Sequence, residues 1–290
     1  MNTRSTAMQQ RNITNVMSSR PASDGAGVKI NRLSGFGSRL NMDPFLMLDE
    51  IRSDNEDEYR AGFPPHPHRG FETVTYMRAG GFSHRDSMGN EGSINAGGAQ
   101  WMTAGSGVIH SEMPLPGDSP MMHGFQFWLN LPAAEKMGPP SYRDIQGGDM
   151  VEFRQDDAQI RLVAGVMAGH EGVVTGKTTR ALLADVSIPA GGKVELKYDD
   201  ELSSQFYVYE GSVRVGETLV KIGQLASLGG GDALQLVAGE QAGLLLFGGL
   251  PINEPVAHHG PFVMNTAAEI EQAIRDYQRG TLVKHPARSL

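Results

Sequence analysis

The chain has 290 residues, a formal net charge of −8 and no cysteine. The lack of cysteine excludes disulfides, thiolate metal sites, iron–sulfur clusters and a cysteine nucleophile, so any metal must be bound by nitrogen and oxygen. The negative charge and the lack of a basic run argue against direct binding to nucleic acid. No apolar stretch approaches the roughly 18 residues of a membrane span, and the first thirty residues contain no apolar signal segment. We therefore expect a soluble, cytoplasmic protein of about two domains that does not bind membranes.

Residues 1–27 are polar and are predicted to form a tail with one early strand at 13–17. From residue 28 onward, short β-like runs alternate with glycine pairs, and no long helical periodicity interrupts them. Many short strands separated by turn signals are typical of an all-β sandwich or barrel. The clearest predicted strands are 71–77, 125–131, 160–166, 181–188, 205–209 and 242–247.

The segment 133–148 interrupts this strand pattern with Gly and Pro residues and is predicted to be a linker. The pattern restarts after it, which favours two all-β lobes, at 28–132 and 149–265. Residues 266–290 are assigned to a C-terminal helix and tail. The helix begins with a capping-box pattern at Thr266 and Glu269 and is expected to stop at Gly280. Its predicted apolar stripe comprises Ile270, Ala273, Ile274 and Tyr277.

Two short motifs carry candidate metal ligands, namely His66-x-His68 and His110-x-Glu112. In extended backbone, residues i and i+2 point to the same face, so each motif delivers two ligands in one direction. Two such strands facing each other would offer three imidazoles and one carboxylate to a divalent metal ion. Four protein ligands on a six-coordinate metal would leave two positions open for a substrate.

Glu72 is a rival ligand. The spacing His-x-His-x3-Glu from His66 to Glu72 approximates the first cupin motif, whose Glu is usually a ligand. The second cupin motif contributes one His, which His110 matches. Five candidates therefore compete for four positions, and Glu72 could instead be a salt-bridged strand residue.

These motifs are embedded in longer stretches that closely resemble the pirin family of two-lobed cupins. The resemblance runs from about residue 26 to 280 and rests on the stretches 41–46, 63–74, 100–105, 107–114, 128–132 and 259–266. It implies two antiparallel β-barrel or jelly-roll lobes of the cupin type, with a C-terminal helix.

The resemblance also implies a ligand set of His66, His68, His110 and Glu112, with Glu72 moved to a supporting role. It implies one metal ion in the N-terminal lobe, with Fe2+ expected and Mn, Ni, Cu, Co or Zn as alternatives. The C-terminal lobe is expected to be metal-free, because residues 198–249 contain no histidine. We further expect His123 near the site and an apolar pocket lined by Phe45, Met47, Trp101 and Met113, whereas His84 is assigned to a surface loop.

Pirins include quercetin 2,3-dioxygenases, which cleave a flavonol with O2 and release carbon monoxide. The resemblance therefore implies this activity, with Glu112 as ligand and base and Glu72 as the fallback base. The alternative is a non-catalytic, redox-sensing iron protein that regulates a transcription factor or a metabolic enzyme. The acidic tract 49–58 is the candidate surface for such a protein partner. The chain is expected to be a monomer.

Overall fold

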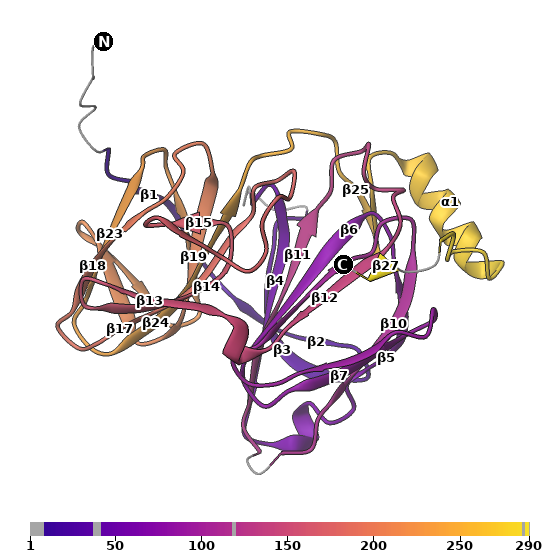
Figure 1. The fold of residues 1–290 in the computed structure, drawn as a ribbon, viewed down its shortest axis with the longest axis horizontal. Helices are drawn as coiled ribbons and strands as arrows, with labels where there is room; N and C mark the ends of the chain where they lie inside the picture. The colour runs from indigo at the N-terminus through magenta and orange to yellow at the C-terminus, as the bar shows by residue number, and fades with distance from the viewer. Residues whose placement is uncertain (1–8, 37–41, 118–119, 286–287, 290) are drawn as a thin grey trace. The chain divides into compact units, whose positions relative to one another are not determined.

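A computed structural model describes residues 9–36, 42–117, 120–285 and 288–289 (Figure 1). Strands dominate these residues, which fold into two compact units. Among the described residues, the N-terminal unit combines those within 20–150 with those from 252 onward, and the C-terminal unit combines those up to 19 with 151–251. Within the described ranges, no helix is long and apolar enough to cross a membrane.

The domain boundaries drawn from the sequence stay a prediction, but three segments have partners that those boundaries did not anticipate. In the expected tail, β1 (Ile13–Ser18) pairs with β22 (Gln224–Leu228) of the C-terminal unit. In the expected linker, β12 (Ser141–Ile145) pairs with β9 (Ala99–Thr103) of the N-terminal unit. The segment that follows residue 252 also belongs to the N-terminal unit. Strand pairing satisfies the backbone N–H and C=O groups of β1 and β12, so these segments are ordered parts of sheets.

The N-terminal unit contains two sheets that face each other. The smaller sheet has the order β5 (Phe63–His68), β10 (Val108–Pro114), β7 (Phe82–Asp86) and β8 (Glu91–Ile94). The larger sheet, whose long central strands are seen in Figure 1, has the order β2 (Arg20–Asp24), β3 (Val28–Ser34), β4 (Phe45–Ser53), β11 (Met122–Asn130), β6 (Phe71–Ala79), β9, β12 and β27 (Arg288–Ser289).

The inner face of the larger sheet is built in rows, because residues opposite each other on paired strands share a face. One row includes Ile51, Gly124 and Met77, and it packs with Phe63 and Phe82 of the smaller sheet in one apolar cluster. The next row is polar, and we call it the polar row. It consists of Arg32, Asp49, Gln126, Thr75, Gln100 and Asp144. The row beyond it is mostly apolar and consists of Ser34, Met47, Trp128, Thr73, Met102 and Tyr142.

The C-terminal unit repeats this two-sheet plan. Its larger sheet has the order β1, β22, β19 (Ser203–Glu210), β24 (Ala242–Gly249), β17 (Leu182–Ile188), β14 (Ala158–Ala164) and β13 (Val151–Gln155). Its smaller sheet has the order β18 (Lys193–Lys197), β23 (Ala233–Ala238), β20 (Ser212–Val215) and β21 (Thr218–Lys221). Beside them lie the short pair β15 (Val166–Met167) and β16 (His170–Glu171). One continuous cluster of buried apolar side chains from both sheets fills this unit.

The C-terminal segment adds the hairpin β25 (Ala257–His259) and β26 (Phe262–Met264), followed by α1 (Ala267–Gln278). Both hydrogen bonds of the predicted capping box are present, between Thr266 and Glu269. Ile270 and Ala273 are buried as expected, but Tyr277 is 42% exposed and the neighbouring Asp276 is buried. The predicted apolar stripe is therefore wrong at Tyr277. Asp276 is the buried residue at this end of the helix, because it forms an ion pair with the buried Arg69.

The six strands predicted most clearly from the sequence are all present, and they correspond to β6, β11, β14, β17, β19 and β24. Two short 3-10 helices, η1 (Glu56–Glu58) and η2 (Gly147–Asp149), interrupt the strand pattern. The acidic tract 49–58 is not one exposed surface. Asp49 and Glu50 are buried in β4, whereas η1 contains no buried residue.

Candidate metal centre and its pocket

Three of the predicted ligands meet inside the N-terminal unit because β5 and β10 are antiparallel neighbours. The register places His110 opposite His66, and Val108 opposite His68. Since His66 and His68 point to one face of β5, all three imidazoles project to the same side. One ligand atom from each of the three rings lies within 4.8 Å of the others. This spacing is compatible with a single metal ion after a small adjustment of the rings.

The hydrogen bonding of the three rings fits a metal site. His68 and His110 are 3% and 2% exposed, and none of their ring nitrogens has a hydrogen-bond partner. Buried polar atoms are normally satisfied, so these nitrogens need a partner of another kind. His66 donates from Nδ1 to the carbonyl of Pro64 at 2.8 Å, which leaves Nε2 as the free lone pair. The donor set suits a divalent transition metal.

The electrostatic environment also keeps two of the rings neutral. Burial lowers the pKa of His68 and His110 well below the ordinary value of 6.5, and the neighbouring His66 acts in the same direction. For His68, the nearby carbonyl of Pro261 opposes this shift. Because only the neutral imidazole can bind a metal ion, these lowered pKa values favour metal binding near neutral pH.

Glu112 lies two residues after His110 on β10, beyond an irregularity in the pairing with β5. Its buried carboxylate accepts hydrogen bonds from Nε2 of Gln126, at 3.0 and 3.3 Å, and from Oγ1 of Thr75, at 3.3 Å. Gln126 and Thr75 belong to the polar row on the facing sheet. Among the described residues, the group of mutually close ligand atoms contains the three imidazoles and not this carboxylate. Ligation by Glu112 therefore stays a prediction.

Glu72 lies on the other face of its strand. Along β6, Thr73 and Thr75 belong to the inner rows, so the alternating side chain of Glu72 points away from the histidines. It is buried there and accepts a hydrogen bond from Thr103 Oγ1 at 2.6 Å. This position does not support a role for Glu72 as a ligand or base at the three histidines.

A pocket of about 600 Å³ leads to the histidines. His66 and His68 form part of its wall, and Gln126 connects the wall to the carboxylate of Glu112. The other lining residues are Asp24, Gly25, Arg32, Ser34, Phe36, Met47, Phe63, Pro64, Pro65, Trp128, His258, Gly260 and Pro261. Pockets of this size with apolar walls and a few polar groups are typical ligand sites.

Of the pocket residues predicted from the sequence, the structure places Met47 in this wall and the others elsewhere. Phe45 packs edge-on against Phe127, and Trp101 is fully buried on β9. His123 is buried and bonded to Glu50, with 3.0 Å between Nε2 and Oε1. Met113 is 40% exposed on β10.

Sequence reasoning missed most of the polar row and misplaced His84. This histidine is 5% exposed on β7, where its Nε2 contacts Oδ2 of Asp144 at 2.9 Å. Asp144 also accepts a hydrogen bond from Gln100 at 2.8 Å. The assignment of His84 to a surface loop was wrong, because β7 turns this side chain toward the facing sheet. A usable signal was the single polar residue between apolar neighbours within a strand, as at Gln126 and Gln100.

The C-terminal segment completes the pocket and supports the ligand strand. His258, Gly260 and Pro261 line the pocket, and the His258 ring stacks on Phe36 at 3.9 Å. Behind His68, the turn to β6 is so close to β26 that a Cβ at Gly70 would lie 2.0 Å from the carbonyl oxygen of Val263. Gly70 also has a φ of +89°, so only glycine fits this turn without strain.

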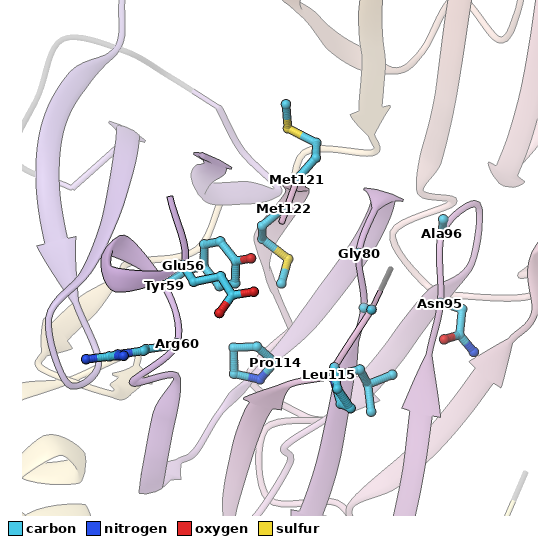
Figure 2. A pocket seen from close by; sticks show the side chains of 13 residues that line it. Glu56, Tyr59, Arg60, Gly80, Asn95, Ala96, Pro114, Leu115, Met121 and Met122 are labelled. Carbon is cyan, nitrogen blue, oxygen red and sulfur yellow. The ribbon is translucent and has the colours of Figure 1, made fainter. Parts of the chain in front are cut away.

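A second pocket, of about 500 Å³, lies between η1 and the segments that follow β6 and β10. Figure 2 shows Tyr59 and Met122 beside one another in it, with Glu56 from the start of η1 and Arg60 from just after its end. Its described lining includes none of the predicted ligands and no histidine. This pocket therefore does not compete with the histidine site as a metal centre.

Two facing-sheet units, one of which holds a cluster of three histidines, define a two-domain cupin. The family model described as "Pirin" matches residues 27–129, and the model described as "Pirin C-terminal cupin domain" matches residues 183–283. The chain therefore belongs to the pirin family.

Individual relatives agree with this assignment. A protein of Vibrio cholerae named "Putative quercetin 2,3-dioxygenase" is 48% identical over 94% of this chain and 98% of its own length. A "Pirin-like protein" of Caulobacter vibrioides is 44% identical over 94% of this chain and 99% of its own. The crystal structure of a quercetin 2,3-dioxygenase from Acinetobacter baumannii matches with a TM-score of 0.85 and 33% identity, over 94% of this chain and 99% of that one.

Proposed function

We propose that the protein is a metal-dependent dioxygenase of the quercetin 2,3-dioxygenase type, which cleaves a flavonol with O2 and releases carbon monoxide. The observation that carries this proposal is the pocket of about 600 Å³ that leads to three clustered imidazoles, two of which have no hydrogen-bond partner. A metal ion there would bind one buried nitrogen of each ring and remain accessible to a ligand in the pocket. The names of the Vibrio and Acinetobacter relatives support the same activity.

The residues that would hold the metal ion are His66, His68, His110 and Glu112, with Fe2+ as the expected ion. A divalent ion at this position supplies Lewis acidity, which polarises chelating oxygen atoms and favours the ionised form of a flavonol hydroxyl group. Nitrogen and oxygen ligands accept several first-row metals, so the identity of the ion depends on supply as well as on the site.

The chain's own residues would position the substrate and hold its proton. Glu112 is the buried carboxylate nearest in sequence to the histidines, and it is the group we expect to accept the hydroxyl proton. Gln126 and Thr75 each donate a hydrogen bond to it, which fixes its orientation. The apolar side chains of Phe63 and Trp128 in the pocket wall would exclude water from the planar rings.

The test is a single-turnover experiment. Apoprotein is loaded with Fe2+ without oxygen, mixed with quercetin and then exposed to air, while flavonol absorbance and released carbon monoxide are followed. We expect loss of the flavonol with equimolar carbon monoxide, and neither event in His68→Ala. Repeating the experiment after loading with Mn2+, Co2+, Ni2+, Cu2+ or Zn2+ ranks these metals by the turnover that each supports.

Iron binding without turnover of several flavonols would contradict this proposal and favour the regulatory alternative, in which a protein partner replaces the substrate. The part of the acidic tract that remains available for such a partner is the exposed segment around η1. A monomeric state and a cytoplasmic location stay predictions under both functions.

A further inference from the structure

Arg32 is a charged residue in the pocket wall that the proposed chemistry does not use. It lies on β3, at the start of the polar row. Its Nε donates to Oδ1 of Asp49 at 2.8 Å, and its Nη2 donates to Oδ2 of the same carboxylate at 2.6 Å. Nη2 also donates to Asp24. Two parallel bonds to one carboxylate fix the plane of a guanidinium group, so Arg32 is held rigidly in place.

One nitrogen of this guanidinium group, Nη1, has no hydrogen-bond partner in the described part of the chain, whereas Nε and Nη2 are engaged. The side chain is 29% exposed and lines the pocket. Its hydrogen bond to Asp49 raises the pKa of Arg32, so the group stays charged at every pH of interest. The two N–H groups on Nη1 are therefore available to an oxygen atom of a ligand.

The register of the larger sheet gives the backbone separation between Arg32 and Gln126, the residue that contacts Glu112. Arg32 pairs with Asp49, and Asp49 pairs with Gln126, so two strand spacings separate Arg32 from Gln126. Neighbouring strands are about 4.8 Å apart, which makes this separation about 10 Å. Gln126 contacts the carboxylate of Glu112. The pocket thus has two polar ends about 10 Å apart, and the rest of its wall includes Met47, Phe63 and Trp128.

We propose that Arg32 determines ligand specificity by donating a hydrogen bond from Nη1 to an oxygen on the ring remote from the chelating oxygens. This inference rests on the proposed function, because it takes a flavonol as the ligand. The hydroxyl group at the 4′ position of the pendant ring is the one furthest from the chelating pair. A hydrogen bond from a charged donor contributes about 1.5–3 kcal/mol, which corresponds to at least a tenfold difference in affinity.

The test compares two ligands that differ by one hydroxyl group, 3-hydroxyflavone and 3,4′-dihydroxyflavone. Their dissociation constants are measured by calorimetry without oxygen, on metal-free and on Zn2+-loaded protein, so that turnover plays no part. We expect the wild type to bind the 4′-hydroxylated ligand at least tenfold more tightly. Arg32→Lys keeps the positive charge beside Asp49 but removes the guanidinium group and with it the Nη1 donor. It should reduce this ratio below about threefold while leaving the affinity for 3-hydroxyflavone unchanged.

Lys29→Gln is the matched control, because Lys29 is a cation on the same strand that faces away from the pocket and pairs with the half-buried Glu58. It should retain the full tenfold ratio. Equal binding of both ligands by the wild type, an unchanged ratio in Arg32→Lys, or no binding of either ligand in both forms would each overturn the inference. Selective binding without oxygen consumption by the Fe2+-loaded protein would refute the dioxygenase activity and leave the role of Arg32 standing.

Discussion

Asn in place of Asp276 should destabilise the N-terminal unit, because Asp276 neutralises a buried cation. Arg69, which follows His68 directly, is 1% exposed and donates to Oδ2 of Asp276 at 2.8 Å. Its other donors reach the carbonyls of Ser106, at 2.7 Å, and Leu282, at 3.0 Å. Removing one partner of a buried ion pair leaves an uncompensated charge, which costs about 3–5 kcal/mol.

The pKa of Asp276 gives an independent magnitude. Burial opposes ionisation, but the hydrogen bonds from Lys284 and Arg69 outweigh it and lower the pKa from 3.8 to about 2. This difference corresponds to about 2 kcal/mol of stability that comes from ionisation alone. A lowered carboxyl pKa stabilises the fold fully above its unfolded value and loses this effect as pH falls from about 4 to about 2. The gap between wild type and Asp276→Asn should therefore be constant from pH 8 to pH 5 and shrink below pH 4.

The two tryptophans make the assay specific, because Trp101 and Trp128 both lie in the N-terminal unit. Urea unfolding followed by tryptophan fluorescence thus reports on that unit alone. Glu271→Gln is the control, since Glu271 pairs with Arg275 on the exposed side of α1 at 3.5 Å and should contribute less than about 0.5 kcal/mol. If Asp276→Asn shifts the unfolding free energy no more than this control, the buried ion pair does not hold α1 and the reasoning is refuted.

Four further predictions concern the metal site and its surroundings. His68→Ala should lower the metal content to a small fraction of one ion per chain, and unchanged stoichiometry by elemental analysis would exclude His68 as a ligand. Glu112→Gln should reduce turnover by about 100-fold or more with partial metal retention, and full activity would remove Glu112 from the mechanism. Because burial lowers the pKa values of His68 and His110, the unfolded chain binds more protons below pH 6.5; melting temperatures of the metal-free protein should fall from pH 7.5 to pH 5.5, and a flat profile would contradict this burial. Lys136, buried and hydrogen-bonded to Gly70, should be essential for stability, so Lys136→Met should cost about 2 kcal/mol or more in urea unfolding, and a cost near zero would show that this contact is dispensable.

The features that the sequence predicted well are local. Alternating apolar residues bounded by glycine predicted the central strands, and the Thr266–Glu269 capping box predicted the start of α1, because each signal lies within a few residues of the element it describes. The convergence of His66 and His68 was predictable for the same reason, since the period of a strand fixes the direction of both side chains.

The features that the sequence did not predict depend on strand register and on partners far along the chain. Nothing near His84 indicates that Asp144 lies opposite it, sixty residues later. Asp49 belongs to an acidic tract and looks exposed until Arg32 is placed beside it. Tyr277 continues an apolar stripe, yet Asp276 is the buried residue because it pairs with Arg69, which lies 207 residues earlier in the chain. In each case an ion pair or hydrogen bond between distant segments overrides the local pattern.

The polar row distinguishes the interior of the N-terminal unit from that of the C-terminal unit. Buried polar groups destabilise a fold unless each finds a partner. Arg32 pairs with Asp49 within the polar row, and other members of the row find their partners on the facing sheet. Glu112 contacts Gln126, and His84 contacts Asp144. Gly92 leaves the space that this second contact needs, since a Cβ there would lie 2.2 Å from both the His84 ring and the Asp144 carboxylate. The C-terminal unit fills its interior with apolar side chains instead, so burial of apolar surface stabilises that sandwich directly. The polar row therefore lies beside the pocket that His66, His68 and Gln126 line, which is where the proposed function needs polar groups.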